Sequence, residues 1–465
     1  MPHRRSLRSP GAWGIALPAR GPAAPWRATA RTVAALAWPA VVEQLLNIGV
    51  DWTDAYLAGH LGTAALAAVG LGGQLLNLVA AFFGALGVGT TALVARAVGA
   101  RDPEAAGRTT YQALEGALLL GVGGMAFALL SGPWLFAALG AEPAVQAVAM
   151  AYLQSVALSF PAMAFLFVGN AALRGAGDTL TPMRIWAVVV VTNALLAWAL
   201  SGPFSPFRLG IVGLGAAAAG ARTLGAVLVF LRLWRGSGRL ALPRRRPWVD
   251  RGLLARILRV GMPAGVEQLL LQLALLNMTG VITGLGTAAY AAHQIGLRVM
   301  SLSFLPGWGF AVAASTLTGQ ALGARQPEAG RRATLVAAAM ALALMGTMGV
   351  ALALGGPWLV DLFTEDPAVI AQGAAALRIT ALIQPAMAVS FVFSGALRGA
   401  GDTRYTLRVT AASIWIVRLP VAALFAHGLG WGLPGAWLGM LADFAVRAFL
   451  FGRRFRSGAW QRIRL

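Results

Sequence analysis

The chain has 465 residues, of which 58% are hydrophobic and only 11% are charged. Soluble domains carry about 25% charged residues, so this composition excludes a water-soluble fold. The formal net charge is +21, and the chain has no cysteine. Disulfides, thiolate metal sites and cysteine nucleophiles are therefore excluded.

Long apolar stretches follow one another along the whole chain. About twelve of them have roughly 20 residues or more, which is enough for a helix to cross a hydrocarbon core of about 30 Å. The expected spans are 33–57, 65–99, 111–131, 145–171, 183–201, 209–234, 257–283, 288–322, 333–355, 368–396, 405–427 and 433–452. We therefore expect an all-α integral membrane protein with about 12 transmembrane helices.

The two halves of the sequence repeat each other. The octapeptide ALRGAGDT occurs at 172–179 and again at 396–403, and at the same offset the segment 42–44 (VEQ) matches 266–268. Each copy holds six expected spans, so both copies enter the membrane from the same side as parallel repeats. We expect two six-helix lobes, related by a pseudo-twofold axis, around a central cleft.

This repeat sets the expected domain boundaries. A disordered, Arg- and Pro-rich cytoplasmic tail covers 1–32, an N-lobe 33–235, a cytoplasmic linker 236–256, and a C-lobe with a basic cytoplasmic C-terminus 257–465.

Each octapeptide follows the fourth span of its half. Its glycines permit positive φ in a tight turn, and its aspartate can cap the next helix. These residues are Gly175, Gly177 and Asp178 in the first copy and Gly399, Gly401 and Asp402 in the second. A phosphate-binding loop is disfavoured, because the lysine of a Walker A motif and its preceding strand are missing.

The arginines gather in alternate loops. They lie at 101–108, 174–184, 239–259, 325–332, 398–408 and 453–464, whereas the intervening loops carry only Arg208. This one-sided bias is the positive-inside pattern and places both termini in the cytoplasm. Nucleic-acid binding is disfavoured, since the basic loops flank apolar spans and lack interleaved aromatic platforms.

On these motifs the chain resembles the multidrug and toxic compound extrusion (MATE) family, bacterial type, of the MOP flippase superfamily. The resemblance covers about residues 33–455 and rests on DAYLAGHLG around Asp54, on LRGAGDT in both halves, and on AAHQIGLRV followed by GQALGA. It implies a multi-pass transporter of the bacterial plasma (inner) membrane that exports organic, often cationic and amphipathic, compounds in exchange for H+ or Na+. The chain departs from the family where many members carry an acid at Leu271, and where some carry an aspartate four residues after Asn193, at Ala197. These departures leave the coupling ion open.

Acidic residues inside the expected spans are candidates for the coupling-ion or proton site. The first helix carries a polar stripe at i, i+4, i+8 and i+11: Glu43, Asn47, Asp51 and Asp54. A charge in the hydrocarbon core costs at least about 2.5 kcal/mol on insertion scales, so each one suggests a function or a partner. Glu267, the repeat counterpart of Glu43, joins this set, and a bound Na+ would use Asp54, Glu43 and Asn47. The alternatives are that Asp51 and Asp54 lie in the headgroup region, and that Glu267 pairs with an arginine such as Arg298.

Other groups are expected to line a substrate cleft. They are Gln74, Asn77, Phe82, His293, Gln294, Met300, Phe304 and Trp308. The alternative for His293 is a hydrogen bond in helix packing, and for each apolar side chain it is packing or lipid contact. Four further arginines within spans, Arg222, Arg298, Arg378 and Arg418, are interpreted as structural, with Asp443 neutralising Arg418.

We expect a secondary transporter that functions as a monomer, because two lobes can enclose a site by themselves. No nucleotide-binding motif is present, so no cofactor is expected beyond the coupling ion. A lipid-linked precursor flippase of the same superfamily is the alternative, and it would need a cationic cavity. An enzyme is disfavoured, because His60, His293 and His427 are well separated in the sequence.

Overall fold

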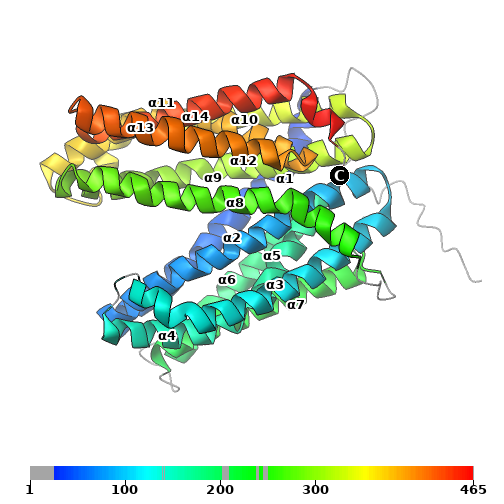
Figure 1. The fold of residues 1–465 in the computed structure, drawn as a ribbon, viewed down its shortest axis with the longest axis horizontal. Helices are drawn as coiled ribbons and strands as arrows, with labels where there is room; N and C mark the ends of the chain where they lie inside the picture. The colour runs from blue at the N-terminus through cyan, green and yellow to red at the C-terminus, as the bar shows by residue number, and fades with distance from the viewer. Residues whose placement is uncertain are drawn as a thin grey trace, which may run out of the picture.

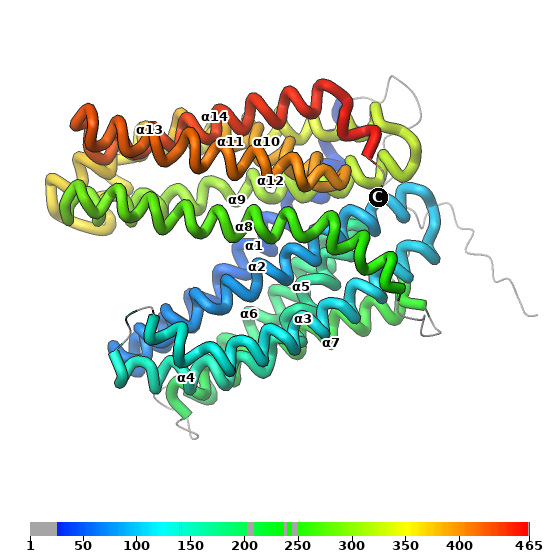
Figure 2. Tube along the Cα trace, viewed as in Figure 1, coloured from blue at the N-terminus to red at the C-terminus, as the bar shows by residue number. Residues whose placement is uncertain are grey.

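The computed structural model describes residues 26–463 and 465, except 139, 141, 202–208, 237–239 and 244–249. All regular elements in this part of the chain are helices (Figures 1 and 2). The N-terminal half holds α1 (Trp26–Leu61), α2 (Thr63–Gly99), α3 (Pro103–Ala138), α4 (Pro143–Ala157), α5 (Phe160–Gly175), α6 (Leu180–Ser201) and α7 (Gly210–Arg235). The C-terminal half holds α8 (Arg251–Thr283), α9 (Thr287–Gly323), α10 (Pro327–Asp361), α11 (Pro367–Ala400), α12 (Thr403–Ala412), η1 (Ser413–Arg418), α13 (Leu419–Ala423), η2 (Leu424–Gly428), α14 (Gly432–Arg456) and η3 (Ala459–Arg462).

The number of spans agrees with the expectation. Within the described ranges, eleven helices are long and apolar enough to cross a membrane, or twelve when the bent pair α4–α5 counts as one. This pair bends by 54° just before Pro161, where the ring removes a backbone donor. Its counterpart α11 continues through Pro385 without a break. The break at this proline is therefore present in one lobe only.

Two hydrophobic cores divide the molecule into an N-lobe (α1–α7) and a C-lobe (α8–η3). Tyr152 and Phe160 are fully buried in the first core, and Trp437 and Phe451 in the second. In Figure 1 the two lobes approach each other at the right-hand end and diverge toward the left.

The first helix of each lobe crosses to the other lobe. The beginning of α1, with Val33 and Leu36, packs in the C-lobe core, whereas Val50 and Leu57 pack in the N-lobe core. The same exchange occurs in α8, where the segment 253–260 packs in the N-lobe core and the segment 278–282 in the C-lobe core. The two lobes are thus interlocked by a repeat-related pair of helices.

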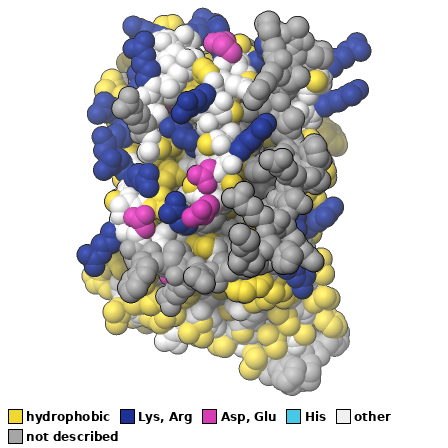
Figure 3. All heavy atoms as spheres, turned by 90° about the vertical axis from the view of Figure 1, so that its right-hand side faces the viewer, with side chains coloured by type: hydrophobic (Ala, Val, Ile, Leu, Met, Phe, Trp, Pro, Cys, Tyr) yellow, Lys and Arg dark blue, Asp and Glu magenta, His cyan; other side chains and the backbone are white. Residues whose placement is uncertain are grey.

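The lobes meet backbone to backbone where α2 and α9 end. A Cβ at Gly99 would overlap the carbonyl oxygen of Gln320, and a Cβ at Gly323 would overlap that of Arg96. Nearby, the Gln320 amide donates to the Gly175 carbonyl at 3.0 Å. We call this end of the molecule, where α2 and α9 finish and α3 and α10 begin, the Arg-rich end. Figure 3 shows the arginine side chains spread over it around a group of acidic ones.

The octapeptide is a turn in both lobes, but its glycines differ in conformation. Gly177 and Gly401 have φ of 89°, as expected. Gly175 and Gly399 remain helical and instead lie against the backbone of the neighbouring helix, at Thr91 of α2 and Ser315 of α9. The expectation of positive φ at these two positions was wrong, because close packing requires a glycine there.

The two aspartates of the octapeptides also differ in role. Asp178 accepts from the Thr181 amide at 2.9 Å and so caps α6, as predicted. Asp402 instead pairs with Arg454 of α14 at 2.8 Å, so the predicted second cap is absent.

Two helices begin earlier than the expected boundaries. α1 starts at Trp26, inside the segment 1–32 that was expected to be disordered, and residues 1–25 lie outside the described ones. Buried Thr29 explains this extension, since the first turns pack against the protein. α8 starts at Arg251, inside the expected linker 236–256, because the Asp250 carboxylate caps it by accepting from the Leu253 amide at 2.9 Å.

Candidate functional site

Each lobe contains a buried glutamate at the middle of its crossing helix, paired with a half-buried arginine. Arg174 of α5 donates to Glu43 of α1 at 2.6 Å, and Arg398 of α11 donates to Glu267 of α8 at 2.8 Å. The members of one pair are each 224 positions from those of the other. Both pairs are thus produced by the duplication. The alternative expected for Glu267, an ion pair with an arginine, is present, but the partner is Arg398 and not Arg298. Arg298 is exposed.

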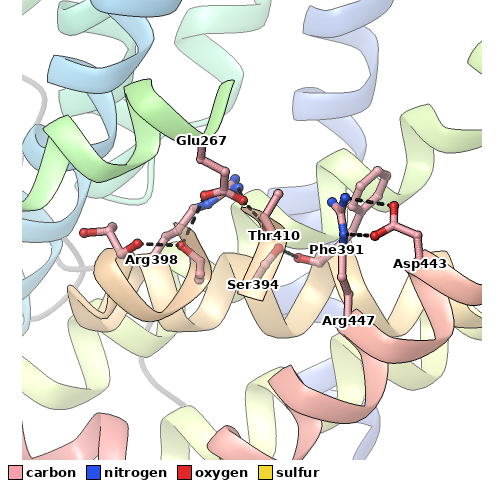
Figure 4. Close-up of polar contacts among 9 residues, drawn as sticks. Glu267, Phe391, Ser394, Arg398, Thr410, Asp443 and Arg447 are labelled. Atoms are coloured by element: carbon pink, nitrogen blue, oxygen red, sulfur yellow. Dashed lines mark hydrogen bonds and ion pairs between the residues drawn. The ribbon is translucent and has the colours of Figure 1, made fainter. Parts of the chain in front are cut away.

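The C-lobe pair has two further donors. The hydroxyl of Thr406 on α12 donates to the Glu267 carboxylate at 3.2 Å. The hydroxyl of Thr410 on the same helix donates to it at 2.8 Å (Figure 4). At the repeat offset, these positions are Pro182 and Trp186 in the N-lobe, which have no hydroxyl. The Glu267 carboxylate is therefore more completely enclosed than that of Glu43.

The N-lobe has a second buried carboxylate. Asp54 of α1 is 3% exposed and accepts from the side-chain amide of Asn193 on α6 at 3.0 Å. The C-lobe counterpart of Asp54 is Met278, which is buried in the core of that lobe. Asp54 is therefore enclosed by protein, whereas Asp51, one turn earlier, is exposed.

The polar stripe of α1 is not one site. Glu43 and Asp54 are eleven positions apart, which is about 16 Å along a helix, and each carboxylate has its own partner. Asn47 is half-buried between them. A sodium site that joins Glu43 to Asp54 is therefore not formed, and no cluster of three metal-ligating side chains is found among the residues that the structure describes.

The predicted cleft residues fall into two groups. On α2, Gln74, Asn77 and Phe82 are exposed. On α9, Gln294, Met300 and Phe304 are partly buried, and Trp308 is exposed. Gln294 donates to the hydroxyl of Tyr290 at 2.8 Å. Their role in contacting a substrate remains a prediction.

His293 is a buried packing residue of α9. Its Nδ1 accepts from the indole N–H of Trp437 on α14 at 3.2 Å, and the two rings pack edge to face. An Nδ1 that accepts carries no proton, so a neutral imidazole protonated at Nε2 fits this contact.

A cluster of buried charges fills the C-lobe between η1 and α14. Asp443 lies 3.8 Å from Arg418, as predicted, but it is bound much more closely by Arg447, at 2.6 and 2.8 Å (Figure 4). The sequence offered a signal for the missed residue, since Asp443 and Arg447 have the i, i+4 spacing of a helical ion pair. Of the other three intramembrane arginines, Arg222 is buried and Arg378 is exposed, as is Arg298.

The fold and these buried charges define a polytopic membrane protein of two interlocked, repeat-related helical lobes. The family model MatE matches residues 39–199 and 263–424, one block in each lobe. The chain belongs to this family, that of the MATE transporters of the MOP superfamily.

Relatives of known name and structure match almost the whole chain. A probable multidrug resistance protein NorM of Thermotoga maritima is 31% identical, with 92% of each chain covered. The multidrug resistance protein PmpM of Pseudomonas aeruginosa is 30% identical over 94% of this chain and 93% of its own. An outward-facing multidrug resistance MATE transporter aligns with a TM-score of 0.86 and 25% identity, covering 94% of this chain and 97% of that one.

Proposed function

We propose that this protein is a secondary multidrug exporter of the bacterial inner membrane, which expels organic, cationic and amphipathic compounds in exchange for H+ or Na+. The arginine bias of alternate loops supports a cytoplasmic location for the Arg-rich end and for both termini. The names of the relatives support multidrug export rather than a lipid-linked precursor as cargo.

The coupling proposal rests on the surroundings of the buried Asp54 carboxylate. Among the described residues it accepts a hydrogen bond from Asn193 and forms no ion pair, although the buried Arg222 lies near enough to act on it electrostatically. A carboxylate buried without a cation in contact is costly unless it takes up a proton or a metal ion. Asp54 is therefore the group that we propose exchanges its cation during transport.

Glu43 and Glu267 have a different role in this proposal. Both are already paired with arginine, so binding of a cation there must first displace Arg174 or Arg398. This displacement would loosen α5 from α1 or α11 from α8. We propose that these ion pairs couple the conformation of each lobe to the position of its crossing helix, while Asp54 holds the coupling cation.

The closed Arg-rich end fits an outward-open state. Thr316 of α9 donates to the Arg174 carbonyl at 2.9 Å, so the C-lobe contacts the same residue that pairs with Glu43. Cation binding from outside would neutralise the acid and release a cationic substrate. Opening of the Arg-rich end would then deliver the ion to the cytoplasm, driven by about 2.3 kcal/mol per charge for each 100 mV.

The test is export of a fluorescent cationic dye from proteoliposomes, with a pH gradient and a sodium gradient imposed separately. We expect one gradient to drive export, Asp54→Asn to abolish the gradient response, and exposed Asp51→Asn to retain it. Glu267→Gln should slow export under the same gradient. Gradient-driven export that survives Asp54→Asn would refute the assignment of Asp54, and absence of any gradient-driven export by the folded wild type would refute the antiporter.

A further inference from the structure

The C-lobe holds a buried charge cluster that the proposed transport cycle does not use. It consists of Arg418 and Ser413 of η1 with Asp443 and Arg447 of α14, and we call it the C-lobe arginine cluster. All four residues are buried, with Asp443 at 0% exposed and Arg418 at 5%. Charges at such positions inside a membrane protein require a compensating partner.

Asp443, the acid of the cluster, already forms a bidentate ion pair with Arg447. Arg447 donates to both oxygens of Asp443 through Nε and Nη2, and the Ser413 hydroxyl donates to Oδ1. Arg418 reaches the same carboxylate only at 3.8 Å through Nη1. A bidentate arginine–carboxylate pair is the stronger arrangement, so Arg418 is the more weakly paired of the two cations.

Among the residues that the structure describes, no acid other than Asp443 pairs with Arg418. His293 on α9 faces the cluster, but a ring whose Nδ1 accepts from Trp437 is not an anion. The cluster therefore contains two guanidinium groups and one carboxylate, with a formal charge of +1.

Arg418 also has an unsatisfied donor. Its Nε is buried and has no hydrogen-bond partner. A guanidinium is planar and presents adjacent N–H groups that match a small anion or a carboxylate. Arg418 ends the π-helical segment Ser413–Arg418, a backbone form that occurs often at functional sites.

We propose that Arg418 binds a small anion in the C-lobe, between η1, α9 and α14. The chemistry required is one negative charge that accepts hydrogen bonds from a guanidinium. Two sources have this chemistry: an inorganic anion such as chloride, and a carboxylate carried by the transported compound. In the second case the N-lobe acid Asp54 and the C-lobe Arg418 would select zwitterions, an extension that rests on the proposed function.

Thermal unfolding of the purified protein in detergent tests the site without requiring transport. Chloride or acetate is titrated in place of gluconate, which is too bulky for a buried site, at constant ionic strength. We expect a saturable rise in the unfolding midpoint for the wild type, because a ligand that binds only the folded state stabilises it. The Arg418→Met variant should show no such rise.

The choice of variant keeps this experiment interpretable. Arg418→Met leaves Asp443 and Arg447 as a neutral buried pair, so the variant should fold in gluconate at least as stably as the wild type. Arg378→Met, which removes an exposed arginine of α11, is the matched control and should keep the anion response. Equal responses of the wild type and Arg418→Met to both anions would overturn the proposal.

Export of a rhodamine with a free carboxylate and of its methyl ester distinguishes the two sources. If the anion belongs to the substrate, Arg418→Met should reduce export of the acid about tenfold and spare the ester, since an unmatched buried charge pair costs at least that factor. If the anion is inorganic, export of both dyes should change equally and depend on chloride. If neither dye is exported but the anion still stabilises the wild type, the proposed export function is refuted and the anion site at Arg418 is not.

Discussion

Gly99 of α2 and Gln320 of α9 touch backbone to backbone across the two lobes, and the duplication repeats this contact at Gly323 and Arg96. No side chain fits at either glycine, so the closed Arg-rich end depends on the absence of two Cβ atoms. The contact also lies beside the octapeptide turn, where Gln320 donates to the Gly175 carbonyl.

We expect Gly99→Ala and Gly323→Ala to open the Arg-rich end. Each added methyl overlaps a carbonyl oxygen, and overpacking of this kind costs about 1–3 kcal/mol, which the lobes can avoid by separating. The readout is the distance between spin labels at exposed Glu104 and Glu328, one on each lobe. Since the chain has no native cysteine, two introduced cysteines are labelled without background.

Gly73→Ala is the control for this experiment, because a Cβ at Gly73, also on α2, would meet open space. It should leave the distance distribution of the wild type unchanged. A distribution in Gly99→Ala that equals this control would show that the backbone contact does not limit opening.

We expect Arg398→Met to destabilise the protein strongly. It leaves the buried Glu267 carboxylate with only two hydroxyl donors, and breaking one side of a buried pair costs about 3–5 kcal/mol. Adding Glu267→Gln should recover most of the loss, since the amide oxygen can accept from Thr410 while the amide nitrogen donates to the hydroxyl oxygen of Thr406. Urea or thermal unfolding in detergent measures both effects, and a double variant no more stable than Arg398→Met would contradict the pairing.

We expect Thr410→Val to destabilise the C-lobe by about 1.5–3 kcal/mol, the usual loss for a hydrogen bond to a charged group. The bond to Glu267 measures 2.8 Å. Thr380→Val on α11 is the matched control, because its hydroxyl donates only to the carbonyl of Ala376 in its own helix. Equal changes in the unfolding midpoint for the two variants would argue against a role of Thr410 at Glu267.

The C-terminal segment after α14 should hold the lobes together at the Arg-rich end. Trp460 is fully buried in the C-lobe, where it stacks on Phe455, and the Ile463 carbonyl accepts from Arg96 of the N-lobe at 2.9 Å. The last residue, Leu465, packs against the N-lobe core. The segment thus bridges the two lobes.

Deletion of residues 459–465 should therefore shift the label distance between positions 104 and 328 toward longer values while the protein still folds. Trp460→Ala should have the same effect, since it removes the anchor in the C-lobe. Exposed Arg462→Ala is the control and should have none. An unchanged distance after the deletion would mean that the segment does not restrain the lobes.

The sequence predicted the fold well because its two strongest patterns, apolar spans and an internal repeat, can be read without knowing any tertiary contact. Each span is an apolar stretch set by membrane thickness, and the offset of 224 is visible without a structure. The start of α1 was placed too late because the Arg-containing residues 26–32 lower the hydropathy there, although they pack as helix.

The site was predicted less completely because its partners are distant in the sequence. Arg174 and Arg398 were interpreted as loop charges of the positive-inside pattern, but both are helical and reach a glutamate 131 positions away. The repeat contained the missing signal, since a glutamate and an arginine are both duplicated at one offset. Asp54 was singled out from the sequence and is buried in the structure, but its contact with Asn193 depends on how α1 packs against α6.

The crossing of α1 and α8 also constrains how the protein is made. The N-lobe core includes Leu253, Ile257 and Val260, which leave the ribosome only after all seven earlier helices. The first half of the chain therefore emerges without these core residues, and its core is completed only after synthesis of the second half begins. A gene split between the repeats would yield two fragments that each lack a piece of their own core, and that could fold only in each other's presence.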